Sequence, residues 1–121
     1  MSNSVPYEFV LDYLPQDVIM KRMFGMHYIY RGKKIMLILR KRENEPELNG
    51  IWIAANKKNH QSLVDEVPEL APYSVKGDDQ YGNWLVITDD ADGLEEAAIK
   101  VCELITHGDA RIGRPTQKPP L

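Results

Sequence analysis

The amino-acid sequence predicts an α+β domain, with helices near both ends of the chain and one inserted, around a mainly antiparallel sheet of about five strands. Three observations predict this class. Short apolar segments separated by glycines or turn residues follow one another between residues 18 and 54. Two other segments, near residues 59–66 and 94–105, carry apolar side chains at helical spacing. The chain of 121 residues, 43% hydrophobic and 27% charged, has the size and composition of one globular domain.

The first forty residues are predicted to form one short helix and three strands. Ser4 is a candidate helix cap, Pro6 fits the first turn, and Pro15 ends the helix. The strands are expected at Val18–Phe24, Met26–Tyr30 and Ile35–Arg40. Gly25 marks a tight turn or bulge between the first two strands, and Gly32 supplies the hairpin turn before the third. Because the third strand is apolar without alternation, it is expected in the middle of the sheet.

The remainder of the chain is predicted to mix helices with strands. The expected elements are a polar loop at Lys41–Gly50, a strand at Ile51–Ala54, a helix from Asn56 or Asn59 to Glu66, an edge strand near Tyr73–Lys76 and a strand at Trp84–Thr88. Asp92 and Glu95 have the spacing of a capping box at the start of the last helix, which Gly108 ends. Residues 1–108 are therefore expected to form the domain, and residues 109–121 a flexible, basic, proline-rich tail.

Charge is segregated along the chain, although the formal net charge is only −3. Residues 21–42 carry eight basic and no acidic side chains, whereas residues 43–121 carry fifteen acidic and seven basic ones. The acidic total argues against a general nucleic-acid binder. A local basic patch nevertheless acts over a Debye length of about 8–10 Å, so the segment from 21 to 42 is a candidate contact surface.

Other features of the sequence indicate the cellular location of the protein. The longest apolar run, Ile35–Leu39, is far shorter than the roughly 20 residues that a membrane-spanning helix needs. The N-terminus has no basic region followed by an apolar one, so no signal peptide is predicted. Cys102 is the single cysteine, is expected to be a buried structural thiol, and can form no internal disulfide. A cytoplasmic location is therefore expected.

The central pattern resembles a known family. The residues Arg22 to Gly25, Tyr28 to Tyr30 and Gly32 to Ile38 resemble the N-terminal domain of the TfoX competence regulators. Residues from Val67 to the last helix are similar to the related MmcQ/YjbR-like group, and the resemblance covers roughly residues 5–107. It implies a compact α+β fold with a curved antiparallel sheet and flanking helices. The wider superfamily is described as having a double-wing arrangement suggestive of DNA binding, and no enzymatic residues carry over from it.

The candidate macromolecule-binding residues are the basic side chains at the two ends of the third strand. They are Arg31, Lys33 and Lys34 at the hairpin turn and Arg40, Lys41 and Arg42 at the strand exit. One interpretation is a basic wing that follows phosphate groups. The other is a solvated hairpin whose cations pair with the acidic helices or prevent edge-to-edge aggregation. The aromatic residues of this segment, Phe24, Tyr28 and Tyr30, are expected in the core, the two tyrosines beneath the first helix.

The sequence contains no recognisable catalytic constellation, cofactor motif or metal-ligand spacing, so no catalytic, cofactor-binding or metal residues are assigned. The prediction is a small non-enzymatic binding or regulatory module of the TfoX N-terminal type. A protein partner is favoured because the total charge is acidic, and nucleic acid bound through residues 31–42 is the second option. The alternative is a small-ligand protein or enzyme with a pocket under the sheet near Trp52, Tyr81 and Trp84. The oligomeric state is not predicted.

Overall fold

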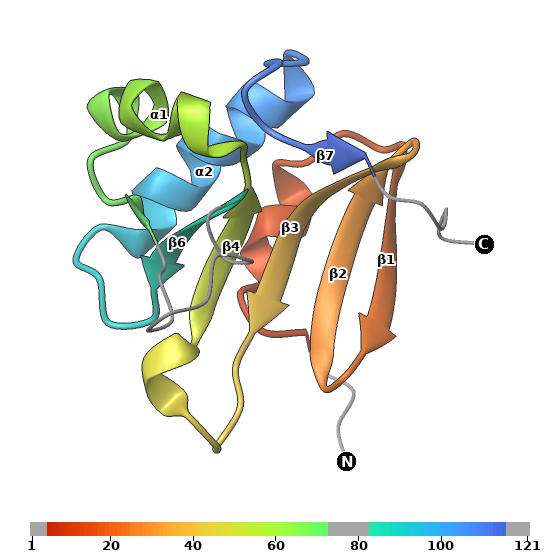
Figure 1. Cartoon of the computed structure of the whole chain (residues 1–121). Coiled ribbons are helices and arrows are strands. Elements are labelled where there is room, and N and C mark those ends of the chain that lie inside the picture. The colour runs from red at the N-terminus through yellow and green to blue at the C-terminus, as the bar shows by residue number, and fades with distance from the viewer. Residues whose placement is uncertain (1–4, 73–82, 116–121) are drawn as a thin grey trace.

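The computed structural model describes residues 5–72 and 83–115, which form a seven-stranded antiparallel sheet with helices packed against one face (Figure 1). The strands are β1 (Val18–Met23), β2 (Met26–Arg31), β3 (Lys34–Arg40), β4 (Gly50–Ala54), β5 (Ala71–Pro72), β6 (Trp84–Thr88) and β7 (Arg114–Pro115). Their order across the sheet is β1-β2-β3-β4-β6-β5, and β7 pairs with β3. The α+β class and the central position of the third strand are thus confirmed, since β3 lies between β2 and β4 and is buried from Ile35 to Arg40.

Strand β7 occupies a part of β3 that β4 leaves unpaired. Strand β4 pairs with β3 only from Leu37 to Arg40, whereas β7 pairs with Lys34 and Ile35 at the opposite end. The amide of Gly113, just before β7, also donates to the carbonyl oxygen of Ala54 at 2.7 Å. The segment after the last helix therefore completes the ladder of the central strand.

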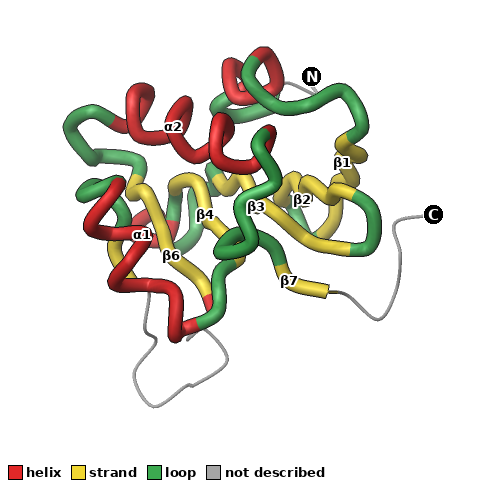
Figure 2. Tube along the Cα trace, turned by 90° about the horizontal axis from the view of Figure 1, so that it is seen from above, coloured by secondary structure: helices red, strands yellow, loops and turns green. Residues whose placement is uncertain are grey.

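The α-helices are α1 (His60–Glu66) and α2 (Leu94–Thr106), and the 3-10 helices are η1 (Glu8–Asp12), η2 (Pro46–Leu48) and η3 (Lys57–Asn59). Figure 2 shows α2 on one side of the sheet, where η1 and α1 share its core. The short helix η2 lies between β3 and β4, and its Leu48 packs against the other face. Side chains from η1, α1 and α2 form the main core with alternate residues of the strands, including the fully buried Val10, Leu63 and Val101. No helix within the described ranges is long and apolar enough to cross a membrane.

Several predicted details of the helices are wrong. The last helix begins after Gly93, which has a left-handed backbone (φ 75°), and no side chain caps it, so Asp92 and Glu95 form no capping box. The first helix is a single 3-10 segment preceded by Tyr7, also left-handed at φ 55°, and Ser4 lies outside the described residues. The middle helix, by contrast, agrees with the prediction: it ends at Glu66 and has Asn59 at its N-cap position, although the Asn59 side chain forms no capping hydrogen bond. The edge strand expected near Tyr73–Lys76 also lies outside the described ranges; β5 ends at Pro72.

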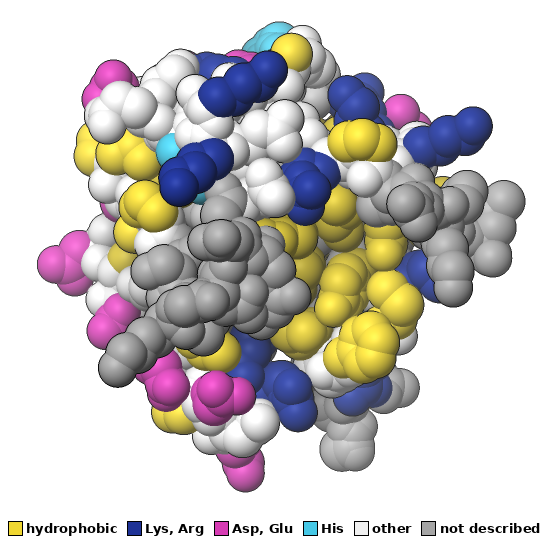
Figure 3. Space-filling model, viewed as in Figure 1, with side chains coloured by type: hydrophobic (Ala, Val, Ile, Leu, Met, Phe, Trp, Pro, Cys, Tyr) yellow, Lys and Arg dark blue, Asp and Glu magenta, His cyan; other side chains and the backbone are white. Residues whose placement is uncertain are grey.

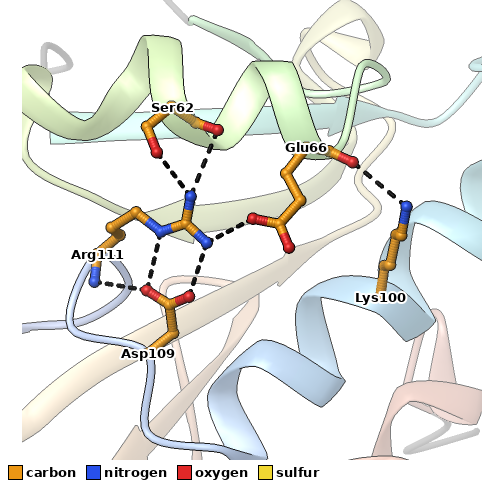
Figure 4. A network of polar contacts seen from close by, with 5 residues as sticks. All are labelled: Ser62, Glu66, Lys100, Asp109 and Arg111. Atoms are coloured by element: carbon orange, nitrogen blue, oxygen red, sulfur yellow. Dashed lines mark hydrogen bonds and ion pairs between the residues drawn. The ribbon is translucent and has the colours of Figure 1, made fainter.

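The domain boundary expected at residue 108 falls inside the packed structure. Ile112 is 3% exposed and belongs to the main core, and β7 follows directly. The Arg111 guanidinium binds Asp109 at 2.7 Å and Glu66 of α1 at 2.6 Å, and also bonds Ser62 (Figure 4). Residues 109–115 are therefore an integral part of the domain, which corrects the prediction of a loose tail for this stretch. Burial and ion pairing outweigh the glycine and proline content that suggested disorder.

Candidate binding site on the open face of the sheet

The sheet face opposite α1 and α2, here called the open face, is apolar and aromatic. Its buried members are Tyr30, Ile35, Ile38, Trp52, Ala54 and Val86, and the partly buried Met23, Met26, Tyr28, Leu48 and Trp84 pack against them. Figure 3 shows hydrophobic side chains gathered over β2 and β3 on this face. An antiparallel sheet packed on one side ordinarily presents polar side chains on the other. Here the second face is apolar, and its partly buried members, among them Met26, Tyr28 and Trp84, are the ones accessible to a partner.

Strand register explains how the face is assembled. Tyr28 pairs with Ile38, Ile38 pairs with Trp52, and Trp52 pairs with Val86, which places four large side chains in one row across β2, β3, β4 and β6. Because side chains alternate along each strand, the neighbouring residues of the same strands enter the helix-side core. Tyr28 and Tyr30 thus lie on the face away from the first helix, and the prediction that they pack beneath it is wrong.

A groove of about 380 Å³ crosses this face and is called the aromatic groove below. Its described lining residues are Met26, Tyr28, Ile38, Arg40, Arg42, Glu45, Leu48, Trp52 and Trp84. The rings of Trp52 and Trp84 meet edge to face with centroids 6.1 Å apart, and the Trp52 Nε1 donates to the Leu48 carbonyl oxygen at 3.0 Å. The volume and the mixture of apolar walls with a few charged groups are those of a ligand site.

Arg40 is a buried cation in the wall of this groove. Its side chain donates to the carbonyl oxygens of Asn44 and Glu45 and to the Oδ1 of Asn49, at 2.7–3.0 Å, and the residue is only 4% exposed. None of the carboxylates in the described ranges forms an ion pair with it. A buried charge that is solvated by neutral acceptors alone keeps a strong field, so this end of the groove favours an anion.

Arg42 is the exposed cation at the same end. Its backbone amide and carbonyl are both bound by the side chain of Asn49, at 2.8 and 2.9 Å. Its guanidinium lies over Gly25, where a Cβ would come within 3.2 Å of the Arg42 Nε. Gly25 therefore leaves space for Arg42 beside the β1–β2 turn, and the side chain remains accessible from solvent.

Phe24 stands beside the aromatic groove in an unusual conformation. It is 77% exposed and has a left-handed backbone (φ 54°), followed by Gly25 at φ 74°. These two residues form the two-residue turn between β1 and β2. Its ring meets that of Tyr28 edge to face at 6.5 Å. The prediction that Phe24 is a core residue is wrong, and its position as an exposed aromatic in a turn that favours Asn instead suits a contact residue.

The six basic candidates do not form one patch. Arg31 binds Asp17 at 3.0 Å and the carbonyl oxygen of Ile105 at 2.7 Å, so it ties β2 to the end of α2. Lys41 binds Asp89 at 2.6 Å on the helix side. Arg40 is buried, Lys33 and Lys34 are exposed at the hairpin tip, and Arg42 is exposed at the groove. The two ends of β3 are about 20 Å apart at 3.3 Å per residue, so the groups at the tip and at the exit act separately.

Other titratable groups lie away from the groove. Burial raises the pKa of the Cys102 thiol to about 12, and the residue is fully buried, as expected. The Nδ1 of His27 is buried and has no hydrogen-bond partner among the described residues, and burial followed by the charge of Arg22 lowers the pKa of this imidazole. Hydrogen bonds from Lys41 and Tyr7 lower the pKa of Asp89. No group of three or more His, Cys, Asp or Glu within residues 5–72 and 83–115 converges on a metal position.

Sequence reasoning named the two tryptophans and two of the basic groove residues, but it missed the groove as a whole. Tyr28 is expected in the core, the apolar residues Met26 and Ile38 carry no signal that separates a groove wall from the core, and Leu48 and Glu45 belong to η2 and the residue before it. Tyr81 lies outside the described residues. Comparison of the chain with family models, curated proteins and solved structures found no match in any of the three.

Proposed function

We propose that this chain is a small non-enzymatic binding module that holds a segment of a protein partner on the open face of its sheet. The observation that carries the proposal is the aromatic groove between Tyr28, Trp52 and Trp84 on a face that α1 and α2 do not cover. Aromatic and methionine side chains concentrate binding energy at protein interfaces. A relationship to the TfoX N-terminal domain would agree with such a role and rests on the pattern from Arg22 to Ile38.

A protein partner fits the charges better than nucleic acid does. Arg31 and Lys41 already have carboxylate partners, and Arg40 contacts the solvent little. A phosphate backbone needs a continuous row of available cations, whereas an apolar groove with a few charged groups suits a peptide. Base stacking on Phe24 and Tyr28 remains the alternative to be tested directly.

The chain contains its own reporter for this test. Both of its tryptophans line the aromatic groove, so their fluorescence emission responds to a molecule bound there. Short random peptides are selected for binding to the whole chain, and the selected peptides and single-stranded and double-stranded oligonucleotides are titrated in turn. Peptides, but not oligonucleotides, are expected to shift the emission.

A matched pair of variants locates the binding surface. Met26→Glu introduces a charge into the groove, whereas Met20→Glu introduces it at a partly exposed methionine whose strand partner, Ile29, belongs to the helix-side core. Binding is expected to weaken about ten-fold or more in Met26→Glu and to stay unchanged in Met20→Glu. Equal binding by both variants would overturn the proposal, as would emission shifts caused by oligonucleotides alone.

A further inference from the structure

The aromatic groove has two chemically different parts. Tyr28, Ile38 and Trp52 form the apolar row across three strands, and Arg40 follows two residues after Ile38 on the same face of β3. Two residues along a strand correspond to about 6.6 Å. The apolar row at Ile38 is thus about 6.6 Å from the positively charged end of the groove at Arg40.

The positive charge at that end is not balanced by an equal number of carboxylates among the described lining residues. The described lining contains two guanidinium groups, Arg40 and Arg42, and one carboxylate, Glu45, although the whole chain is acidic with a formal charge of −3. The buried Arg40, three of whose five N–H donors bind carbonyl-type oxygens, contributes mainly through its field. The exposed Arg42, held at its backbone by Asn49, is the group positioned to bind an anion directly.

The groove has the length of a short peptide. It crosses four neighbouring strands, from Met26 and Tyr28 on β2 to Trp84 on β6, which is about 14 Å at 4.8 Å per strand. An extended chain covers that distance with about four residues. The cationic end lies to one side of this path, because the apolar row runs across the strands and the step from Ile38 to Arg40 runs along β3.

We infer that the partner segment is an extended acidic peptide whose apolar side chain enters the groove between Tyr28 and Trp52, and whose nearby Asp or Glu binds Arg42. This inference rests on the proposed function and adds the chemistry of the partner. The apolar side chain supplies most of the affinity, and the carboxylate fixes direction and register on the sheet.

The test compares an acid with its amide. The selected peptides are expected to contain an aromatic or large aliphatic residue near an Asp or Glu. Replacing that acid by its amide is expected to weaken binding to the wild-type chain about ten-fold, the loss typical of a charge-assisted hydrogen bond, and raising the salt concentration is expected to narrow the difference. Tryptophan emission is the readout, and a small aromatic carboxylate is titrated as a separate arm.

The matching protein variants are Arg42→Gln and Lys41→Gln, which remove the same charge from neighbouring positions on opposite sides of the sheet. Arg42→Gln is expected to bind the acid and amide peptides equally, and Lys41→Gln to keep the preference. If peptides bind in the groove without an acid preference, or if the preference survives Arg42→Gln, the inference is wrong and the proposed function stands. If no peptide binds, both fail. A small carboxylate that binds as tightly as the peptide identifies a small-ligand site instead and overturns both.

Discussion

Phe24 is the residue at which local preference and the fold disagree most clearly. A turn of two left-handed residues favours Asn followed by Gly, because Asn adopts this conformation at little cost and a bulky side chain does not. Here the first position holds a phenylalanine that is also 77% exposed. Natural sequences retain such conflicts mainly where a function depends on them.

The substitution Phe24→Asn separates folding from binding. We expect the free energy of unfolding to stay unchanged or to rise by up to about 1 kcal/mol, because Asn suits the turn and the lost ring was largely in solvent. Binding of a selected peptide is expected to weaken. Urea unfolding and fluorescence titration measure the two effects on the same sample. A variant that is clearly less stable would show that the contact with Tyr28 outweighs the backbone cost.

Among the elements, the segment after α2 is fixed by one arginine. Arg111 bridges Asp109 and Glu66, so it links the chain before β7 to α1 (Figure 4). Its hydrogen bonds lower the pKa of the Asp109 carboxyl, and the side chains of both residues are about four-fifths buried. Such a pair contributes more than a surface ion pair does.

The sign of the pH effect follows from this lowered pKa. A carboxyl group with a lower pKa in the folded chain stabilises the fold fully above its unfolded pKa, about 3.9, and loses this contribution as the pH falls through the folded value. Arg111→Gln is therefore expected to lower the free energy of unfolding by about 1–2 kcal/mol at neutral pH, with a difference that shrinks below about pH 4. Urea unfolding across this range measures it. A difference independent of pH would show that packing, not the ion pair, is responsible.

Strand β4 begins at a glycine whose position leaves no room for a Cβ atom. A Cβ on Gly50 would lie 2.2 Å from the backbone oxygen of Ile87 on β6, and the φ of this residue is 150°. Gly50→Ala is expected to lower the free energy of unfolding by about 2–4 kcal/mol, because backbone atoms of two strands must separate. Gly32→Ala is the control: its φ is also positive, at 62°, but no atom of the described part of the chain lies within 4 Å of its Cβ position. Its cost is expected to be about 1 kcal/mol. Equal losses in thermal unfolding would contradict the steric explanation.

For the whole molecule, the contacts of residues 109–115 predict where the chain can be shortened. A chain that ends at residue 108 loses the burial of Ile112, the Arg111 ion pairs and the pairing of β7 with β3. We expect it to be less stable by about 3–5 kcal/mol. A chain that ends at residue 115 keeps all these contacts and is the control. Equal stability of the two shortened chains in urea would show that the described contacts contribute nothing.

The sequence predicted the main strands and their order along the chain, because their apolar runs are bounded by clear turn residues. Trp84–Thr88 was predicted with the observed bounds, and the unbroken run Ile35–Leu39 correctly indicated a central strand. The sequence could not show which face of β3 the helices cover, because apolar residues occupy both faces of this strand. The two tyrosines of β2 were misplaced for the same reason, whereas Phe24 was misplaced because it lies in the β1–β2 turn and not in a strand. Strand β7 was missed because two residues carry no periodicity and form a strand only through the unpaired end of β3.

The candidate site was less predictable than the fold. The clustering of charge predicted six basic contact residues. Ion pairs and burial, which depend on tertiary contacts, determine which of these side chains are available to a partner. Arg40 has the same local sequence signal as Lys41 and Arg42, although it is buried and Arg42 is exposed beside the groove. Only the register of β3 with β4 distinguishes them.

The two apolar faces of β3 also bear on how the chain finds its native state. In a strand with one polar face, slipping by one residue would expose every core side chain, so hydrophobicity alone selects the pairing. Ile35–Leu39 gives no such penalty, and correct alignment must come from the irregularity between Ile29 and Tyr30, the turn at Gly32 and the polar bonds of Arg40. Collapsed forms in which β3 is misaligned with β2 or β4 should therefore compete with the native form during refolding. The hydrogen bonds of the Arg40 guanidinium to the β3–β4 connection favour the native alignment.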